Sequence, residues 1–182
     1  MIKKAFIIFL VIFNLVALVY LITPTPKIPD LYNSLKSNEP GDTIQIPNVS
    51  AYYTNLTRTE VMNFYKANFD GPFRIRLNYP PEKSKEIIKD TIQSYYFEEY
   101  NLPFKESLYI NGFEWENDVF TKPEKRVKNK LIYEGKTYKA KITIRTFTPS
   151  IPKRLASFFA TETAIISIIL IYKSFLKKDK NA

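Results

Sequence analysis

One apolar stretch constrains this chain more than any other feature: the 18 residues from Ala5 to Ile22 are apolar except for Asn14. As a helix this stretch rises about 27 Å, close to the thickness of the hydrocarbon core of a bilayer. A second apolar stretch, from Leu155 to Tyr172, lies near the other end and contains one acidic residue, Glu162. We therefore expect transmembrane helices at 5–22 and 155–172, with a water-facing domain between them.

Positive charge is concentrated at the far ends of the two apolar stretches. Two lysines precede the first stretch, and four lysines follow the second within residues 173–182. Because lysine and arginine collect on the cytoplasmic side, both termini are expected in the cytoplasm and the domain outside it. Lys153 and Arg154 lie on the other flank, but long domains translocate largely regardless of charge. Two alternatives stay open: the reverse orientation, and a C-terminal stretch that lies flat in the interface because Glu162 interrupts it.

The first stretch resembles a secretory signal but ends without the small-residue site that cleavage needs, so we expect an uncleaved signal anchor. The chain between the spans has the composition of a folded domain, since the whole sequence is 45% apolar and 15% aromatic. The expected organisation is a cytoplasmic leader at 1–4, a Pro-rich linker at 23–42, an extracytoplasmic domain at 43–148, a short tether at 149–154 and a basic cytoplasmic tail at 173–182.

Helix and strand signals alternate within the domain. A capping box predicts a helix from Thr57 to about Phe69, and apolar residues at helical spacing predict a second helix over about 82–100. Strands are predicted at 42–47, 73–79 and 107–115, the last with a possible turn at Asn111-Gly112, and two more around a Glu134-Gly135 turn within 131–147. The predicted fold class is α+β, a small two-layer sandwich of about two helices on one face of a mostly antiparallel sheet of four or five strands.

The residue composition excludes several classes of catalytic site. The sequence has no Cys and no His, which removes disulfides, thiol nucleophiles, imidazole bases and Cys/His zinc sites. Its four glycines each occur in a turn-like context, so no glycine-rich phosphate loop is expected. We therefore predict no catalytic, cofactor-binding or metal residues, and expect that the chain is not an enzyme.

Any catalysis would have to rest on carboxylates, Lys, Tyr or Ser, and the carboxylates offer a candidate group. Glu114, Glu116 and Asp118 alternate along a predicted strand, and paired carboxylates hydrolyse glycosides. Aromatic residues would then stack on the sugar, although core packing is their more frequent use. These aromatic residues are Trp115, Tyr95, Tyr96, Phe97 and Tyr100.

Two groups of basic residues are candidate anion-binding surfaces. The first would share the open sheet face if two predicted strands lie in one sheet, and consists of Arg74, Arg76, Lys139, Lys141 and Arg145. The second is a basic loop with Lys122, Lys125, Arg126, Lys128 and Lys130. Both groups could bind anionic headgroups or an envelope polyanion, or could simply solvate the surface. RNA binding is not expected, because the predicted face lacks the stacking aromatics of sheet-based RNA readers.

The two spans carry a second candidate site. In an antiparallel hairpin, Asn14 and Glu162 would lie at similar depths, about 12 Å and about 10 Å below the outer ends of their spans. An amide can both donate to and accept from a carboxyl, which is costly in hydrocarbon without a partner. Small residues on one face of the second span would allow close helix packing, namely Ser157, Ala160, Thr161, Ala164 and Ser167. The spans would pack on each other or on the helices of a partner, unless Glu162 snorkels to the interface.

These observations favour a non-enzymatic, two-span membrane protein whose domain is an interaction or assembly module of an envelope membrane complex. Its expected partners are membrane lipids and another membrane or envelope protein, or a second copy of the chain, with no nucleic acid and no cofactor. Two alternative functions stay open: a headgroup or polyanion binder, marked by strong salt dependence, and a carboxylate-dependent hydrolase of envelope sugars.

Overall fold

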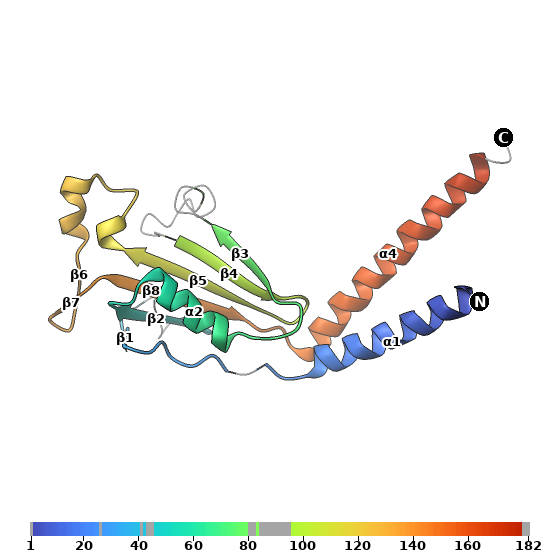
Figure 1. Cartoon of the computed structure of the whole chain (residues 1–182), viewed down its shortest axis with the longest axis horizontal. Coiled ribbons are helices and arrows are strands. Elements are labelled where there is room, and N and C mark those ends of the chain that lie inside the picture. Colours follow the sequence, from blue (N-terminus) through green and yellow to red (C-terminus); the bar gives the residue numbers. More distant parts are fainter. Residues whose placement is uncertain are drawn as a thin grey trace. The chain divides into compact units, whose positions relative to one another are not determined.

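The computed structural model describes residues 2–25, 27–40, 42, 46–79, 83 and 96–179. The chain divides into two compact units, each treated by itself below. One unit combines Met1–Thr25 with Pro149–Ala182, and the other is Pro26–Thr148. The protein is thus α+β, with an apolar helix near each end and a sheet between them in the sequence (Figure 1).

The first unit consists of two long helices, α1 (Ile2–Ile22) and α4 (Ile151–Asp179). Segments of 19 residues in α1 (Lys4–Ile22) and 26 residues in α4 (Ile151–Leu176) are long and apolar enough to cross a membrane. Both lie where the sequence predicted spans, and α4 begins four residues before the expected span. Pro152 is in the first turn of α4, where a residue without a backbone N–H is tolerated.

The C-terminal end of α1 and the N-terminal end of α4 are joined by a buried arginine. Arg154 Nη1 donates to the carbonyl of Leu21 at 3.2 Å, and its Nε donates to the carbonyl of Pro149 at 2.8 Å. The last carbonyls of a helix lack partners within it and carry partial negative charge, so a cation there is favourable. Further along, the rings of Phe13 and Phe158 pack with centroids 6.4 Å apart.

The second unit is built on a six-stranded sheet in the order β1-β2-β8-β5-β4-β3, with every neighbouring pair antiparallel. Its strands are β1 (Ser34–Lys36), β2 (Val49–Thr54), β3 (Ile75–Tyr79), β4 (Tyr96–Leu102), β5 (Glu106–Glu114) and β8 (Ala140–Phe147). A separate hairpin of β6 (Leu131–Tyr133) and β7 (Lys136–Tyr138) confirms the predicted turn. Glu134 and Gly135 both have positive φ, as the favoured two-residue hairpin turn requires.

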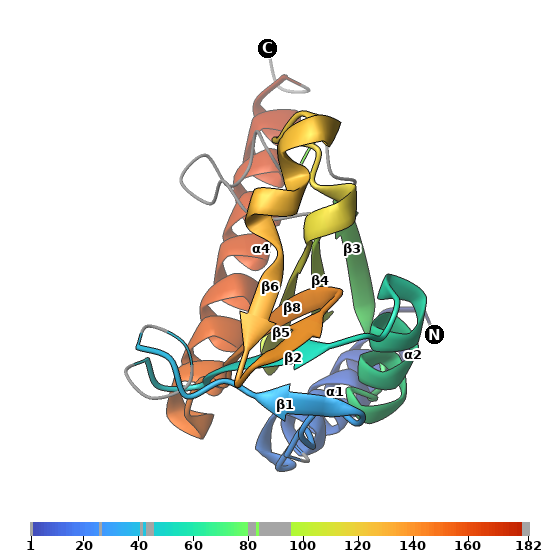
Figure 2. The ribbon, with the colours of Figure 1, turned by 90° about the vertical axis from the view of Figure 1, so that its left-hand side faces the viewer.

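Helix α2 (Arg58–Asn68) lies on one face of this sheet. Figure 2, which looks along the sheet from the end that carries β6 and β7, shows α2 on one side of the strands. The predicted capping box is confirmed: the Thr57 N–H donates to Glu60 Oε2 at 2.8 Å, and the Glu60 N–H donates back to Thr57 Oγ1. The side chains of Val61 and Tyr65 are fully buried against the sheet.

The main core lies between α2 and the sheet. Side chains from alternate strand positions are buried there, including Tyr52, Tyr96, Tyr100, Leu108, Ile110 and Ile142. Gly112 is directly opposite Tyr96 in the β4–β5 ladder, and a Cβ at Gly112 would occupy the space of the Tyr96 ring. The absence of a side chain at this position therefore makes room for a fully buried tyrosine.

The second predicted helix, over 82–100, is wrong at its C-terminal end, because residues 96–100 belong to β4. The rest of that range lies outside the described residues, apart from Lys83. Residues 96–100 were predicted as helix because β4 lacks the alternation of apolar and polar residues that identifies a strand. The alternation is lost because a charged residue, Glu98, is fully buried. Asn111-Gly112 is also not a turn, since both residues lie inside the continuous strand β5.

Two further boundaries differ from those predicted. The Pro-rich segment at 23–42 is not a linker throughout, because β1 pairs with β2 and Leu31 is buried. The sixth strand of the sheet comes from this segment. The strand predicted at 42–47 lies partly outside the described residues, and Asp42, Ile46 and Pro47 are in turns or bends.

Candidate functional site

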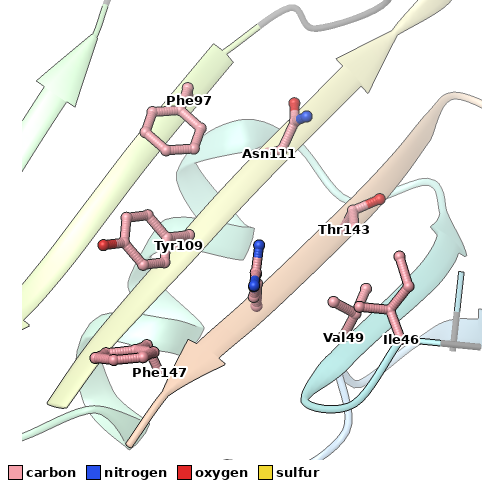
Figure 3. Close-up of a pocket in the computed structure, with 8 residues that line it drawn as sticks. Ile46, Val49, Phe97, Tyr109, Asn111, Thr143 and Phe147 are labelled. Carbon is pink, nitrogen blue, oxygen red and sulfur yellow. The ribbon is translucent and has the colours of Figure 1, made fainter. Parts of the chain in front are cut away.

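The face of the sheet away from α2, here called the open face, contains a groove of about 610 Å³. Because side chains alternate along a strand, the residues between the buried positions of β4, β5 and β8 all point to this side. The groove is lined by Ile46, Val49, Phe97, Tyr109, Asn111, Thr143, Arg145 and Phe147. Figure 3 shows three aromatic side chains, from Phe97, Tyr109 and Phe147, along one side of it.

The groove combines aromatic rings with one cationic side chain. The rings of Phe97 and Tyr109 stack with centroids 5.9 Å apart, and Phe147 is 58% exposed. Arg145 is exposed and lies directly opposite Tyr109 in the β5–β8 ladder. No carboxylate in the described part of the chain forms an ion pair with Arg145. Glu99 is on the same face, but it is two strands away, about 10 Å at the usual strand spacing.

Two polar side chains lie between the aromatic residues and Ile46 on the floor of the groove, those of Asn111 and Thr143. The Oδ1 atom of Asn111 is buried and accepts no hydrogen bond from any described residue. A buried acceptor without a donor is costly, and a ligand that supplies a donor would remove this cost. The groove therefore has an apolar wall, a cation and a free acceptor, which suits an amphipathic, acidic ligand.

Beside the groove, the open face carries a charge cluster in which one cation, Lys141, lies between two carboxylates. Lys141 Nζ lies 2.9 Å from Asp42 and 3.2 Å from Glu39, and the Tyr53 hydroxyl donates to Glu39 at 2.6 Å. Burial disfavours the charged ammonium of Lys141, but the hydrogen bond to Asp42 and the surrounding negative groups outweigh it and raise its pKa to about 12. Burial, with the hydrogen bond to Glu39, raises the pKa of Tyr53 to about 12. Lys141 is thus an internal ion-pair partner.

On the other side of the sheet, under α2, two arginines flank a carboxylate that is fully buried. Glu98 Oε1 accepts from Arg58 Nε at 2.9 Å, and Glu98 Oε2 accepts from Arg76 Nε at 3.0 Å and from Arg76 Nη2 at 2.6 Å. The Arg58 guanidinium also lies 5.0 Å from the centroid of the Tyr96 ring. These contacts tie α2, β3 and β4 together.

The structure does not bring the five predicted anion-binding residues onto one face. Arg76 lies opposite Tyr100 in the ladder, on the α2 side, and Arg74 donates from Nη1 to the carbonyl of Phe69 at 2.8 Å. Lys139 is exposed but lies between β7 and β8. Only Lys141 and Arg145 share the open face. For Arg76 the reason is the orientation of β3, in which Arg76 points to the α2 side and Ile75 and Leu77 point to the open face.

The sequence did not place the aromatic residues of the groove on the open face, although it named Phe97 as a possible sugar-stacking residue. The open face was predicted to lack stacking aromatics, and this was wrong, because Phe97, Tyr109 and Phe147 are there. Phe97 was assigned to the end of a helix, together with Tyr96 and Tyr100, which are core residues. The alternation of Tyr109 with the buried Leu108 and Ile110 was a usable signal, but the supposed turn in β5 obscured it.

The basic loop forms a 3-10 helix, η2 (Pro123–Asn129), and its cations have separate environments. Arg126 donates from Nη1 to the carbonyl of Glu116 at 2.8 Å, and Lys130 lies 6.0 Å from the Trp115 ring centroid. Lys122, Lys125 and Lys128 are exposed. The predicted basic surface is therefore reduced to these three exposed lysines.

The three predicted carboxylates are divided between two environments. Glu114 and Glu116 line one pocket of about 310 Å³, together with Arg58 and Lys139. Asp118 is buried and accepts from the N–H of Phe120 and the amide of Asn129, so it stabilises a turn. Trp115 and Glu116 belong to a short 3-10 helix, η1 (Trp115–Asn117), instead of a strand. Within the described ranges, no group of His, Cys, Asp or Glu is arranged to hold a metal ion.

The predicted intramembrane residues are not paired with one another. Asn14 Nδ2 donates to the carbonyl of Leu10 in its own helix at 3.1 Å, and Glu162 has no hydrogen-bond partner among the residues that the structure describes. The contact between α1 and α4 uses Phe13 and Phe158. The small residues Ser157, Ala160, Thr161, Ala164 and Ser167 are all exposed, so this face is not used for packing within the described chain.

Comparisons with protein-family models, with curated proteins and with solved structures give no significant match to this chain.

Proposed function

We propose that this chain is a non-enzymatic, two-span membrane protein whose domain is an interaction or assembly module of an envelope membrane complex. The observation that supports this proposal is the groove on the open face, where stacked aromatic rings and an arginine line the same groove and the arginine has no ion-pair partner among the described residues. Aromatic residues and arginine are enriched where proteins bind each other. In the predicted two-layer sandwich, helices cover one face of the sheet, and the other face is left for a partner.

The proposed partner is an acidic segment of another membrane or envelope protein, or of a second copy of the chain. A carboxylate of that segment would pair with Arg145, and its apolar side chains would pack against Phe97, Tyr109 and Phe147. A donor from the same segment would satisfy Asn111 Oδ1. A catalytic role is not required by this arrangement.

Site-specific photo-crosslinking in intact cells tests the groove. A photoreactive phenylalanine analogue at Tyr109 should give a discrete adduct, and the additional change Arg145→Glu should abolish it by charge repulsion. Ile132 is the matched control position, since it is 64% exposed on the β6–β7 hairpin outside the groove. An adduct at position 109 that persists with Arg145→Glu, or that also forms at position 132, would count against the proposal.

The proposed topology places both termini in the cytoplasm and the domain outside, with α1 as an uncleaved signal anchor. The support is the positive charge at the far ends of both helices and the length of the apolar segments. Since the chain has no Cys, single thiols introduced by Thr121→Cys and Asn181→Cys can be labelled on intact cells with a membrane-impermeant reagent. Labelling at 121 alone fits the proposal, and labelling at 181 alone reverses the topology.

A second candidate function is hydrolysis of envelope sugars, favoured by the pocket that Glu114 and Glu116 share. The expected result for this alternative is an activity that is lost on Glu114→Gln while the domain stays folded. Binding of anionic headgroups or polyanions is the third candidate, with Arg145 and the exposed lysines of η2 as its cations. It predicts binding that weakens strongly with salt, whereas binding through the aromatic groove should depend on salt only modestly.

A further inference from the structure

Four exposed apolar side chains gather at one end of the sheet. Phe147 is the last residue of β8 and pairs with the beginning of β5, next to the β4–β5 turn that contains Phe104. Phe73 precedes β3, which pairs with the end of β4, and Ile46 precedes β2, which pairs with the end of β8. Their exposed fractions are 42% for Ile46, 74% for Phe73, 40% for Phe104 and 58% for Phe147. These four residues are here called the apolar rim.

Two residues of the rim are held in an unusual backbone conformation. Phe73 has φ of 63° and Phe104 has φ of 60°, in the left-handed region that bulky residues avoid. Each follows a proline in a turn, the position where glycine or asparagine is the usual choice, and the Lys105 N–H closes the second turn on the carbonyl of Leu102 at 2.9 Å. Phenylalanine in this position is costly for the backbone and exposes its ring, which suggests that the ring serves a function.

The short connection between β8 and α4 limits how far the rim can lie from a bilayer that α4 crosses. Only residues 148–150 separate Phe147 from Ile151, where α4 begins its apolar segment of 26 residues. Four extended peptide steps span at most about 14 Å. If α4 crosses the bilayer, Phe147 therefore lies within the reach of the headgroup region, which is where exposed aromatic side chains are stabilised.

We propose that the apolar rim docks onto the phospholipid bilayer in which the chain is anchored, with the two proline–phenylalanine turns inserted among the headgroups. The ligand is the lipid surface itself, and the contact is driven by apolar burial without a need for anionic lipid. Docking would restrict rotation of the domain about its connections to the helices, and would present the open face in a defined orientation. This inference rests on the membrane anchoring. Ile46 and Phe147 also line the groove, so the test uses Phe73 and Phe104, which do not.

The full chain, reconstituted into phosphatidylcholine vesicles with brominated acyl chains, gives a direct test. Trp115 is the only tryptophan, so single tryptophans can be placed at the rim in a Trp115→Phe background, as Phe73→Trp or Phe104→Trp. Bromine quenches tryptophan only at short range. We expect the tryptophan fluorescence of both variants to be weaker in brominated than in unbrominated vesicles. We also expect both tryptophans to emit at a shorter wavelength than a tryptophan that is exposed to buffer.

Ile132→Trp in the same background is the matched control, because Ile132 is equally apolar and exposed but lies on the hairpin beyond the other end of β5 and β8. It should keep its emission. Quenching at positions 73 and 104 no greater than at 132 would overturn the proposal. Because the vesicles contain no other protein, a rim that served a protein partner would also show no quenching. Quenching at all three positions would indicate that the domain contacts lipid without a preferred end, and would likewise refute it.

Discussion

Replacing Glu98 by glutamine tests whether the buried ion cluster under α2 holds the domain together. Both carboxylate oxygens of Glu98 are engaged, Oε1 by Arg58 and Oε2 by Arg76, at distances of 2.6 to 3.0 Å. Glutamine keeps the volume but removes the charge, and it turns an N–H₂ group toward one of the two guanidinium groups. Two cations from different elements would then share a site with no counter-charge.

The expected loss of stability is about 3 kcal/mol. Removing one partner of a buried ion pair typically costs about 3 to 5 kcal/mol, because the remaining charge is left uncompensated. The lower end applies here, since the Arg58 and Arg76 side chains are 28% and 45% exposed and water can reach them. A loss of this size would lower the melting temperature of a domain this long by about 10 °C.

Urea unfolding of the full chain in detergent micelles measures this loss through the fluorescence of Trp115, whose Nε1 donates to the Tyr138 carbonyl within the domain. Glu99→Gln is the matched control, since Glu99 is the next residue and points to the opposite face of β4. A surface change of that kind is expected to alter the free energy of unfolding by less than about 0.5 kcal/mol. If Glu98→Gln were within about 1 kcal/mol of Glu99→Gln, the reasoning about the cluster would be refuted.

Two further predictions concern the core and the charge cluster on the open face. Gly112→Ala should destabilise the domain by about 1 to 3 kcal/mol, because the new Cβ would displace the buried Tyr96 ring, and Tyr96→Leu in the same chain should recover part of that loss in urea unfolding. The pKa of Lys141 is raised to about 12, so its ion pairs stabilise the domain below pH 10.5 by about 1 kcal/mol after allowance for solvent screening, and this contribution is lost as pH rises through 12. Lys141→Met should therefore lose less stability than the wild type between pH 10 and pH 12, and an equal loss in both would contradict the assignment.

Local signals in the sequence predicted the elements that depend on neighbouring residues. The Thr57–Glu60 capping box, the Glu134-Gly135 hairpin and the two long apolar helices are all present. Each of these is decided by contacts between residues a few positions apart, or by the length of one apolar run. Alternation along β8 also matches the burial of Ala140, Ile142 and Ile144, because that strand is central and has one apolar face.

Predictions that depended on register or on distant partners fared worse. The sequence gives no measure of how β3 pairs with β4, so Arg76 was expected on the open face although it pairs with Glu98 beneath α2. Glu98 itself, as a buried charge, made β4 resemble a helix and hid Phe97. The candidate groove was therefore missed, because its residues come from four separate segments of the chain.

The sequence by itself determined the membrane-compatible ends, the class of the fold and the absence of cysteine and histidine chemistry, since composition and local periodicity are sufficient for these. The tertiary structure decided which face of each strand is buried and where every charged side chain finds its partner. The physical reason is that side chains alternate with a period of two, so a shift of one residue in the pairing of a strand moves all its side chains to the opposite face. The segment from Ile75 to Leu77 could present the cation of Arg76 or the apolar side chains of Ile75 and Leu77 to the open face, and only pairing with β4 selects the second.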